Sequence, residues 1–327
     1  MLDLLREVVP YDAHIWLLTD PVTTVGAAPH AFVPCLPELP TLIKAKYLTP
    51  VGRWTTQTTA TATLRGATHG QLSRSRAWRD VMARYGVRDV LSTVFRDQFG
   101  MWGFLELWRI HPAEPFDKED AELLADLAPI LTRATREAQA ATFRPDSATQ
   151  RQDLGPVVLT LDDDLRILSR TAASQVWLDQ LLPPSGGNPA VPASVYNVAA
   201  QLLATEQDID DHPPYSRTHL RDGLWLTLLA ARITGEDQQP GRIVVTLHEA
   251  SARDRLEVWT RAAGLSVRER ELVGLLASGG NTRSIAAAMD VTENTVQDHF
   301  KAVFTKTGTR DRIAVLARAL GTTEAGP

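Results

Sequence analysis

Residues 265–320 of this 327-residue chain carry helix start and stop signals at such short spacing that few folds accommodate them. Ser266 and Glu269 stand three residues apart, the spacing of a capping box that begins a helix. Gly279 and Gly280 follow an apolar stretch and end that helix. The punctuation predicts an all-α domain of four short helices packed on one another.

A short helix, a turn and a longer amphipathic helix follow. Asn281 or Thr282 starts the short helix, and Thr292 caps the longer one. The polar side of the longer helix has mixed charge, since Asp298 precedes Lys301 by three residues. Its apolar side chains recur at i, i+4 and i+7 and should face the core: Val296, Phe300 and Val303. This order of elements is a helix-turn-helix arrangement.

The stretch LSVRERELVGLLASGGNTRSIAAAMDVTENTVQDHFKAVFTKTGTRDRIAVLA, residues 265–317, resembles the LuxR-type helix-turn-helix domain. The resemblance implies that the third helix lies in the major groove of double-stranded operator DNA. It implies base contacts from Gln297, Asp298 and Lys301, and phosphate contacts from Thr282, Arg283, Asn294, Thr295, His299 and Lys306. The family usually dimerises through its last helix, which assigns that role to Ile313, Leu316, Ala317 and Leu320.

The three base-facing side chains differ in chemistry. Lys301 can donate to guanine O6 and N7, and Gln297 can pair with adenine N6 and N7. Asp298 has two interpretations: it accepts from cytosine N4, or it is an i,i+3 partner that positions Lys301. Residues 264–327 hold 8 Lys and Arg against 7 Asp and Glu. Because this charge is small, we expect tight binding to need a homodimer with two half-sites.

The fold class expected for the whole chain is multidomain: α+β sensor domains with antiparallel sheets and helices precede the all-α four-helix head. The expected segments are a sensor domain, a linker, a second sensor domain, a connecting helix and the DNA-binding head: residues 1–142, 143–154, 155–250, 251–264 and 265–327.

The first segment resembles a GAF domain in PYDAHIWLLTD, RDQFGMWGFLELWR and PFDKEDAELLADLAP. Aromatic and β-branched runs predict strands at His14–Asp20, Val87–Phe95 and Met101–Ile110. A serine start and a glycine end predict one capped helix over Ser73–Gly86. Asp117 caps a long helix that closes the domain.

The middle segment resembles a PAS domain in GPVVLTLDDDLRILSRTAASQVWL, although Arg170 stands where that family often has Asn. Residues 157–169 predict two strands around an acidic turn, residues 171–182 a helix and residues 182–192 a loop. Residues 215–250 predict three antiparallel strands.

Sensing of an unidentified small molecule is implied by these resemblances, and no cofactor or metal is predicted. Five tryptophans could line a ligand pocket or simply fill the core: Trp16, Trp54, Trp78, Trp102 and Trp108. The chain does not fit a phosphorylated receiver domain, which needs a lysine to contact the phosphoryl group. No lysine occurs between Lys118 and Lys301. The Trp/Tyr/Asp pattern of an acyl-homoserine-lactone domain is not identified either.

Enzymatic function is not expected, because G-x-S-x-G, H-E-x-x-H, P-loop and G-x-G-x-x-G motifs are absent from the sequence. Cys35 and His30 make a weak nucleophile pair. A ligand-processing GAF protein and a signalling adaptor with a degenerate DNA-binding head stay as alternatives. The N-terminus lacks a secretory pattern and no apolar run spans a membrane, which favours the cytoplasm. Expected partners are operator DNA, a second copy of the chain, an effector and RNA polymerase.

Overall fold

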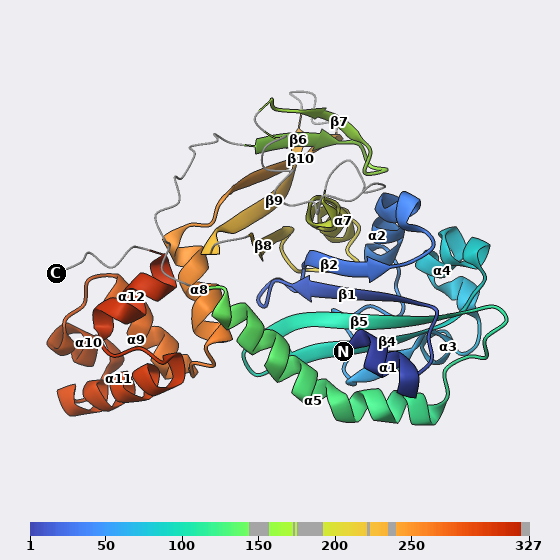
Figure 1. Ribbon diagram of the computed structural model, residues 1–327. Helices are drawn as coiled ribbons and strands as arrows, with labels where there is room; N and C mark the ends of the chain where they lie inside the picture. Colours follow the sequence, from blue (N-terminus) through green and yellow to red (C-terminus); the bar gives the residue numbers. More distant parts are fainter. Residues whose placement is uncertain (144–156, 173, 175–191, 221–222, 235–239, 322–327) are drawn as a thin grey trace.

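The computed structural model describes residues 1–143, 157–172, 174, 192–220, 223–234 and 240–321. Figure 1 shows two antiparallel sheets that lie one above the other, with a helical domain to one side. This arrangement confirms the expected multidomain α+β class. No helix in the described part of the chain is long and apolar enough to cross a membrane.

The first sheet has the order β2-β1-β5-β4-β3. Its strands are β1 (Ala13–Thr19), β2 (Gly26–Phe32), β3 (Thr61–Thr63), β4 (Val87–Asp97) and β5 (Gly100–Ile110). Gly100 turns between the two long strands with φ of 155°, where a Cβ would lie 2.5 Å from the Pro21 carbonyl oxygen. The three strands predicted from sequence are confirmed.

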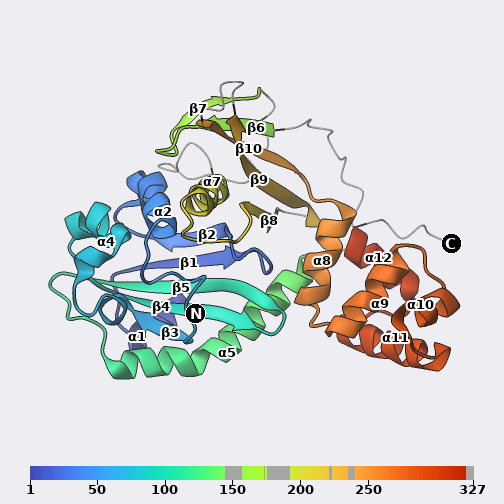
Figure 2. The ribbon, with the colours of Figure 1, turned by 180° about the vertical axis from the view of Figure 1, so that it is seen from behind.

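Helices cover both faces of this sheet (Figures 1 and 2). They are α1 (Leu2–Val8), α2 (Leu39–Tyr47), α3 (Leu64–Ala67), α4 (Arg76–Asp80) and α5 (Lys118–Ala141), with 3-10 turns at Leu36–Glu38, Leu72–Arg74 and Met82–Tyr85. Asp117 caps α5 through a capping box with Asp120, as expected.

The single helix predicted over Ser73–Gly86 is wrong. Ser75 is the residue that caps α4, and the backbone leaves helical geometry at Val81, where φ is −132°. Val81 and Met82 are both fully buried, and turning them into the core breaks the helix. Only the left-handed stop at Gly86, φ 69°, is as predicted.

The second sheet repeats the strand order of the first, as β7-β6-β10-β9-β8. Its strands are β6 (Val157–Leu161), β7 (Ile167–Arg170), β8 (Tyr215–His219), β9 (Trp225–Thr234) and β10 (Pro240–Glu249). The predicted strands are confirmed. The helix and loop predicted over residues 171–192 lie almost wholly outside the described residues. The predicted linker also lies outside them, apart from Phe143.

Helix α7 (Ala193–Glu206) lies between the two sheets and was not predicted. It contacts α2 and β2 of the first domain and β8, β9 and β10 of the second. Its side chains, among them Val195, Val198 and Ala199, join one apolar core with Leu17 and Leu42. The two α+β domains therefore share a core instead of standing apart.

Helix α8 (Ala252–Ala262) leads into the head and is capped by Ser251. Arg136 of α5 donates to the Ala262 carbonyl at 3.1 Å, and Arg261 donates to the Phe99 carbonyl at 3.0 Å. The head contains α9 (Val267–Ala277), α10 (Thr282–Met289), α11 (Glu293–Thr307) and α12 (Arg312–Leu320). These contacts dock the start of the head on the first domain.

Candidate nucleic-acid interface

Both helices of the motif begin at side-chain caps, and the turn between α10 and α11 begins at a left-handed residue. Asn281 accepts from the Ser284 N–H at 2.9 Å and starts α10. Asp290 ends it in the left-handed region, φ 54°, which a short polar side chain tolerates. Thr292 then accepts from the Thr295 N–H at 3.2 Å and starts α11. The predicted helix-turn-helix geometry is confirmed.

An ion pair ties α11 to the first helix of the head. Ser266 and Glu269 form the predicted capping box, and Lys306 donates to the Glu269 carboxylate at 2.6 Å. Burial alone would raise the pKa of the Glu269 carboxyl group, but the hydrogen bonds from Lys306 and the Ser266 N–H outweigh this effect. The pKa of Glu269 therefore lies below its ordinary value. The pair links the last turn of α11 to the first turn of α9.

The outer face of α11 presents the predicted base-contacting side chains to solvent. Val296, Phe300 and Val303 are buried on the inner face, so Gln297, Asp298 and Lys301 point outward and are exposed. Lys301 donates to Asp298 at 2.9 Å, and both side chains are more than 70% exposed. The free protein therefore adopts the i,i+3 pair; the contact of Asp298 with cytosine stays a prediction.

The predicted phosphate-contacting residues divide into two groups. Asn294 and Arg283 are exposed, while Thr282, Thr295 and His299 are half-buried. The Thr295 hydroxyl bonds that of Thr292 at 2.9 Å. Lys306 is exposed to solvent yet already paired with Glu269. Their contacts with DNA stay predictions.

Sequence reasoning missed Arg312. This side chain donates to the Thr282 hydroxyl at 2.9 Å and lies over the Phe300 ring, 4.1 Å from its centroid. It joins the start of α12 to α10 and α11. No local pattern signals this contact, because 30 residues separate Arg312 from Thr282.

The predicted dimer residues on α12 are not equally accessible. Ile313 is 70% exposed, whereas Ala317 is 3% exposed and faces the interior of the head. Leu316 and Leu320 are partly buried and pack on the core of the head. Helix α12 also contacts α8. In this conformation only Ile313 offers a free apolar side chain, so the four-residue dimer stripe stays a prediction that needs α12 to be uncovered.

The five tryptophans do not gather in one pocket, and their contact with a ligand stays a prediction. Trp54, Trp78 and Trp108 pack in the core that faces α2, whereas Trp102 and Trp16 pack in the core that faces α5. Four indole N–H groups donate within the protein, to Thr24 O, Val87 O, Asp97 Oδ1 and Glu106 Oε2. The first sheet separates these two groups of tryptophans, and packing in the two cores accounts for the position of most of them.

A cavity of only about 40 Å³ lies beneath α2 in the first domain. Trp54 lines it, and Lys46 of α2 spans it to pair with Glu106 of β5. This volume is close to that of one or two water molecules. In this conformation the space beneath α2 holds no larger ligand.

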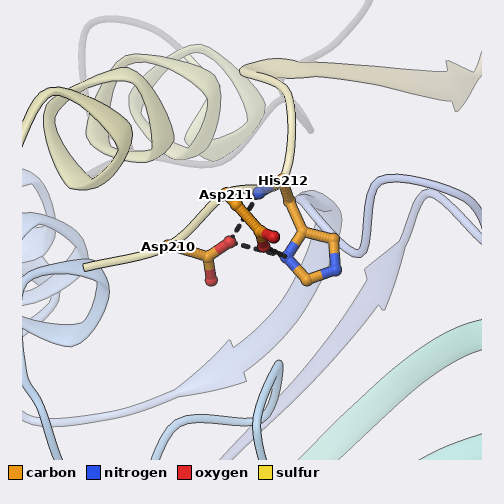
Figure 3. A group of neighbouring side chains, drawn as sticks. All are labelled: Asp210, Asp211 and His212. Carbon is orange, nitrogen blue, oxygen red and sulfur yellow. Dashed lines mark hydrogen bonds and ion pairs between the residues drawn. The ribbon is translucent and has the colours of Figure 1, made fainter. Parts of the chain in front are cut away.

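Asp210, Asp211 and His212 are close enough to hold a metal ion (Figure 3). The Asp210 carboxylate, however, pairs with Arg53 and accepts from His212 Nδ1 at 2.6 Å. Hydrogen bonding to Asp210 is the main cause that raises the pKa of His212. The cluster connects Arg53 of the first domain to the loop after α7.

Cys35 and His30 do not form a nucleophile pair. Cys35 is fully buried, and burial raises the pKa of its thiol to about 11. His30 Nδ1 lies 3.2 Å from His14 Nε2. The thiol therefore stays protonated at neutral pH.

Comparison with known proteins identifies the head. Residues 263–319 match the family described as bacterial regulatory proteins, luxR family. The monoamine regulon transcriptional regulator of Klebsiella aerogenes is 33% identical over 86 residues, which are 26% of this chain and 38% of that protein. The match thus spans well under half of the relative. The C-terminal segment is a LuxR-type helix-turn-helix domain.

Solved structures align over more of the chain but with low scores. SdiA of Escherichia coli aligns with 98% of this chain and 87% of its own, at 14% identity and a TM-score of 0.32. SdiA in complex with octanoyl-rac-glycerol aligns with 98% of this chain and 85% of its own, at 11% identity and a TM-score of 0.33. VqmA of Vibrio cholerae, in a complex with ligand and DNA, aligns with 52% of this chain and 85% of its own, at 18% identity and a TM-score of 0.22. Scores this low do not establish a common overall fold.

Proposed function

We propose that this protein is a DNA-binding transcriptional regulator that reads its operator with α11. The observation that carries the proposal is the outer face of α11, where Gln297, Asp298 and Lys301 are exposed on a capped helix of a luxR-family head. Asn294 and Arg283 are exposed beside them for phosphate contacts. A homodimer places two such helices in successive major grooves, and RNA polymerase is the further partner we propose.

The two α+β domains are proposed to be GAF-like and PAS-like sensors that act through α8. Their identical strand order and their common core with α7 support treating them as one sensing unit. Docking of α8 on α5, through Arg136 and the Ala262 carbonyl, supports a mechanical route to the head. A bound effector changes how α8 holds the two heads.

The proposed function is tested by selecting bound sites from random DNA with the purified full-length protein. Mass spectrometry of the same preparation identifies any retained small molecule. We expect a two-fold symmetric consensus and an affinity that falls steeply as salt rises. A fragment of residues 250–327 that binds the consensus as tightly as the full chain, with and without every retained molecule, contradicts the sensing part.

A second candidate is a signalling adaptor whose head no longer binds DNA. It is favoured by one observation: Lys301 pairs with Asp298 and Lys306 with Glu269, so both lysines of α11 are neutralised within the head. Retention on immobilised DNA separates the candidates. An adaptor shows no salt-dependent retention, whereas a regulator elutes at a salt concentration set by its phosphate contacts.

A further inference from the structure

We propose that a small, uncharged and mostly apolar ligand binds in a cavity between the two sensor domains. The inference rests on the proposed sensing function and gives it a place and a class of ligand. The cavity has a volume of about 400 Å³, within the range of roughly 300–1,000 Å³ typical of ligand pockets. It is about ten times larger than the cavity under α2.

Three walls from distant parts of the sequence form this cavity. Trp16 and Leu18 of β1 line it from the first sheet, and Ala138 and Gln139 of α5 line it from the covering helix. The third wall comes from β8 and β9 of the second domain and includes Trp225. Its lining is therefore mostly hydrocarbon and aromatic, which favours an apolar ligand.

The lining includes buried polar atoms of Gln139 and Trp225 that have no hydrogen-bond partner among the described residues. Gln139 is 9% exposed and its Oε1 accepts no hydrogen bond, while Trp225 is 2% exposed and its Nε1 donates to no acceptor. A buried polar group without a partner costs about 1–3 kcal/mol. Each atom exposes less than 1 Å² to solvent, so the two side chains must turn toward the cavity before a ligand with one donor and one acceptor, such as a secondary amide or an alcohol, satisfies both.

The charge of the cavity favours an uncharged ligand. Arg217 is the charged side chain in the lining, and its guanidinium already pairs with Asp20 at 2.6 Å and with Glu257 at 2.8 Å. Together with these two carboxylates it forms a cluster of net charge −1, which the N-terminal ammonium of Met1 in the lining balances, so the cavity offers no excess charge to an ion. The pairing has a second consequence, because Glu257 belongs to α8: a ligand against Arg217 lies one side chain away from the helix that leads to the head.

The experiment uses N-phenyl-1-naphthylamine, an uncharged aromatic probe with one N–H donor whose fluorescence rises on leaving water. We expect saturable enhancement with one site per full-length chain. Filling the cavity with Ala138→Trp or Ala134→Trp, both at exposed positions of its rim, should lower the affinity at least tenfold. Glu137→Trp is the control, since this exposed neighbour on α5 does not line the cavity.

Gln139→Leu tests the polar contact and should weaken binding of the probe several-fold, because its N–H loses the Oε1 acceptor. The proposal is overturned if the wild type shows no saturable site, or if Ala138→Trp and Ala134→Trp bind as tightly as Glu137→Trp. It is also overturned if the two filling variants shift the sedimentation coefficient from dimer to monomer, since a second copy then covers the groove. The probe is titrated without DNA, so failure of DNA binding leaves this result separate.

Discussion

At the scale of single residues, the pair formed by Asp298 and Lys301 lies on the outer face of α11, the helix proposed to read DNA. The pair is solvent-exposed and contributes about 0.2–0.5 kcal/mol to the free protein, so binding to DNA can break it easily. Lys301→Ala should lower affinity for the selected operator about tenfold or relax specificity at one guanine, since a good base contact is worth about 1–3 kcal/mol.

Fluorescence anisotropy with operator variants at several salt concentrations measures both effects. Asp298→Ala should change the preference at one cytosine and leave other positions as they are. An Asp298→Ala protein that binds every sequence more tightly would show that Asp298 acts only as a charge neighbour of Lys301.

Glu269 connects α11 to the start of α9. Its carboxylate completes the cap of α9 and accepts from Lys306 of α11. Glu269→Gln should lower the free energy of unfolding by about 1 kcal/mol at pH 7. Because the folded-state pKa of Glu269 is depressed, the stabilisation is present above its unfolded value of 4.5 and is lost as pH falls through the folded value.

Urea unfolding at pH 7 and at pH 3 tests this sign. The difference between wild type and Glu269→Gln should shrink in acid. Arg268→Met, which breaks an exposed pair with Glu271 on the same helix, is the control and should cost less than about 0.5 kcal/mol. A difference that grows in acid contradicts the assignment.

At the scale of elements, the head was predictable because its signals are local. Caps at Ser266, Asn281 and Thr292 fix helix starts within three residues, and the 3.6-residue period separates Val296 from Gln297. Helix α7 was not predictable in this way, because it is buried on nearly all sides and its polar residues, such as Asn197 and Gln201, are buried together with the apolar ones. The contact of Lys306 with Glu269 crosses 37 residues, so sequence spacing could not reveal it.

Helix α7 packs closely on the first sheet at Gly26. A Cβ on Gly26 would lie 2.6 Å from Leu17 Cδ2 and 2.7 Å from Asn197 Nδ2. Gly26→Ala should therefore destabilise the protein by about 1–3 kcal/mol through overpacking. Gly274→Ala in α9 meets nothing within 4 Å and should stabilise by about 0.5–1 kcal/mol. Thermal unfolding of both variants checks the opposite signs, and equal shifts would argue against close packing of α7.

At the scale of the whole molecule, buried ion pairs hold the parts together. Asp20 of the first domain and Arg217 of the second are both fully buried, and Arg217 also pairs with Glu257 of α8. Asp20 and Arg217 are 197 positions apart, so the contact between the two domains could not be predicted from the sequence. Asp20→Asn removes one charge from the buried pair and should cost about 3 kcal/mol.

Limited proteolysis and urea unfolding followed by circular dichroism measure this effect. We expect Asp20→Asn to lower the unfolding midpoint and to open cleavage between the domains. A variant with the same midpoint and cleavage pattern as wild type would mean that the common core alone holds the domains together.

The cluster around Asp210 makes the same junction sensitive to pH. The bond to Asp210 raises the pKa of His212 above its ordinary value of 6.5, whereas Asp210 stays ionised, because burial raises its pKa but the bonds from His212 and the charge of Arg53 lower it more. Protonated His212 therefore stabilises the junction below pH 6.5, and this contribution is lost as pH rises through the folded pKa of His212.

His212→Asn should be less stable than wild type at pH 6, with a gap in urea midpoints that closes by pH 9. Asp211→Asn, at an exposed side chain 3.8 Å away, keeps the Asp210 bond and should retain most of the dependence; a gap in His212→Asn that is constant with pH would show that His212 does not titrate at the junction.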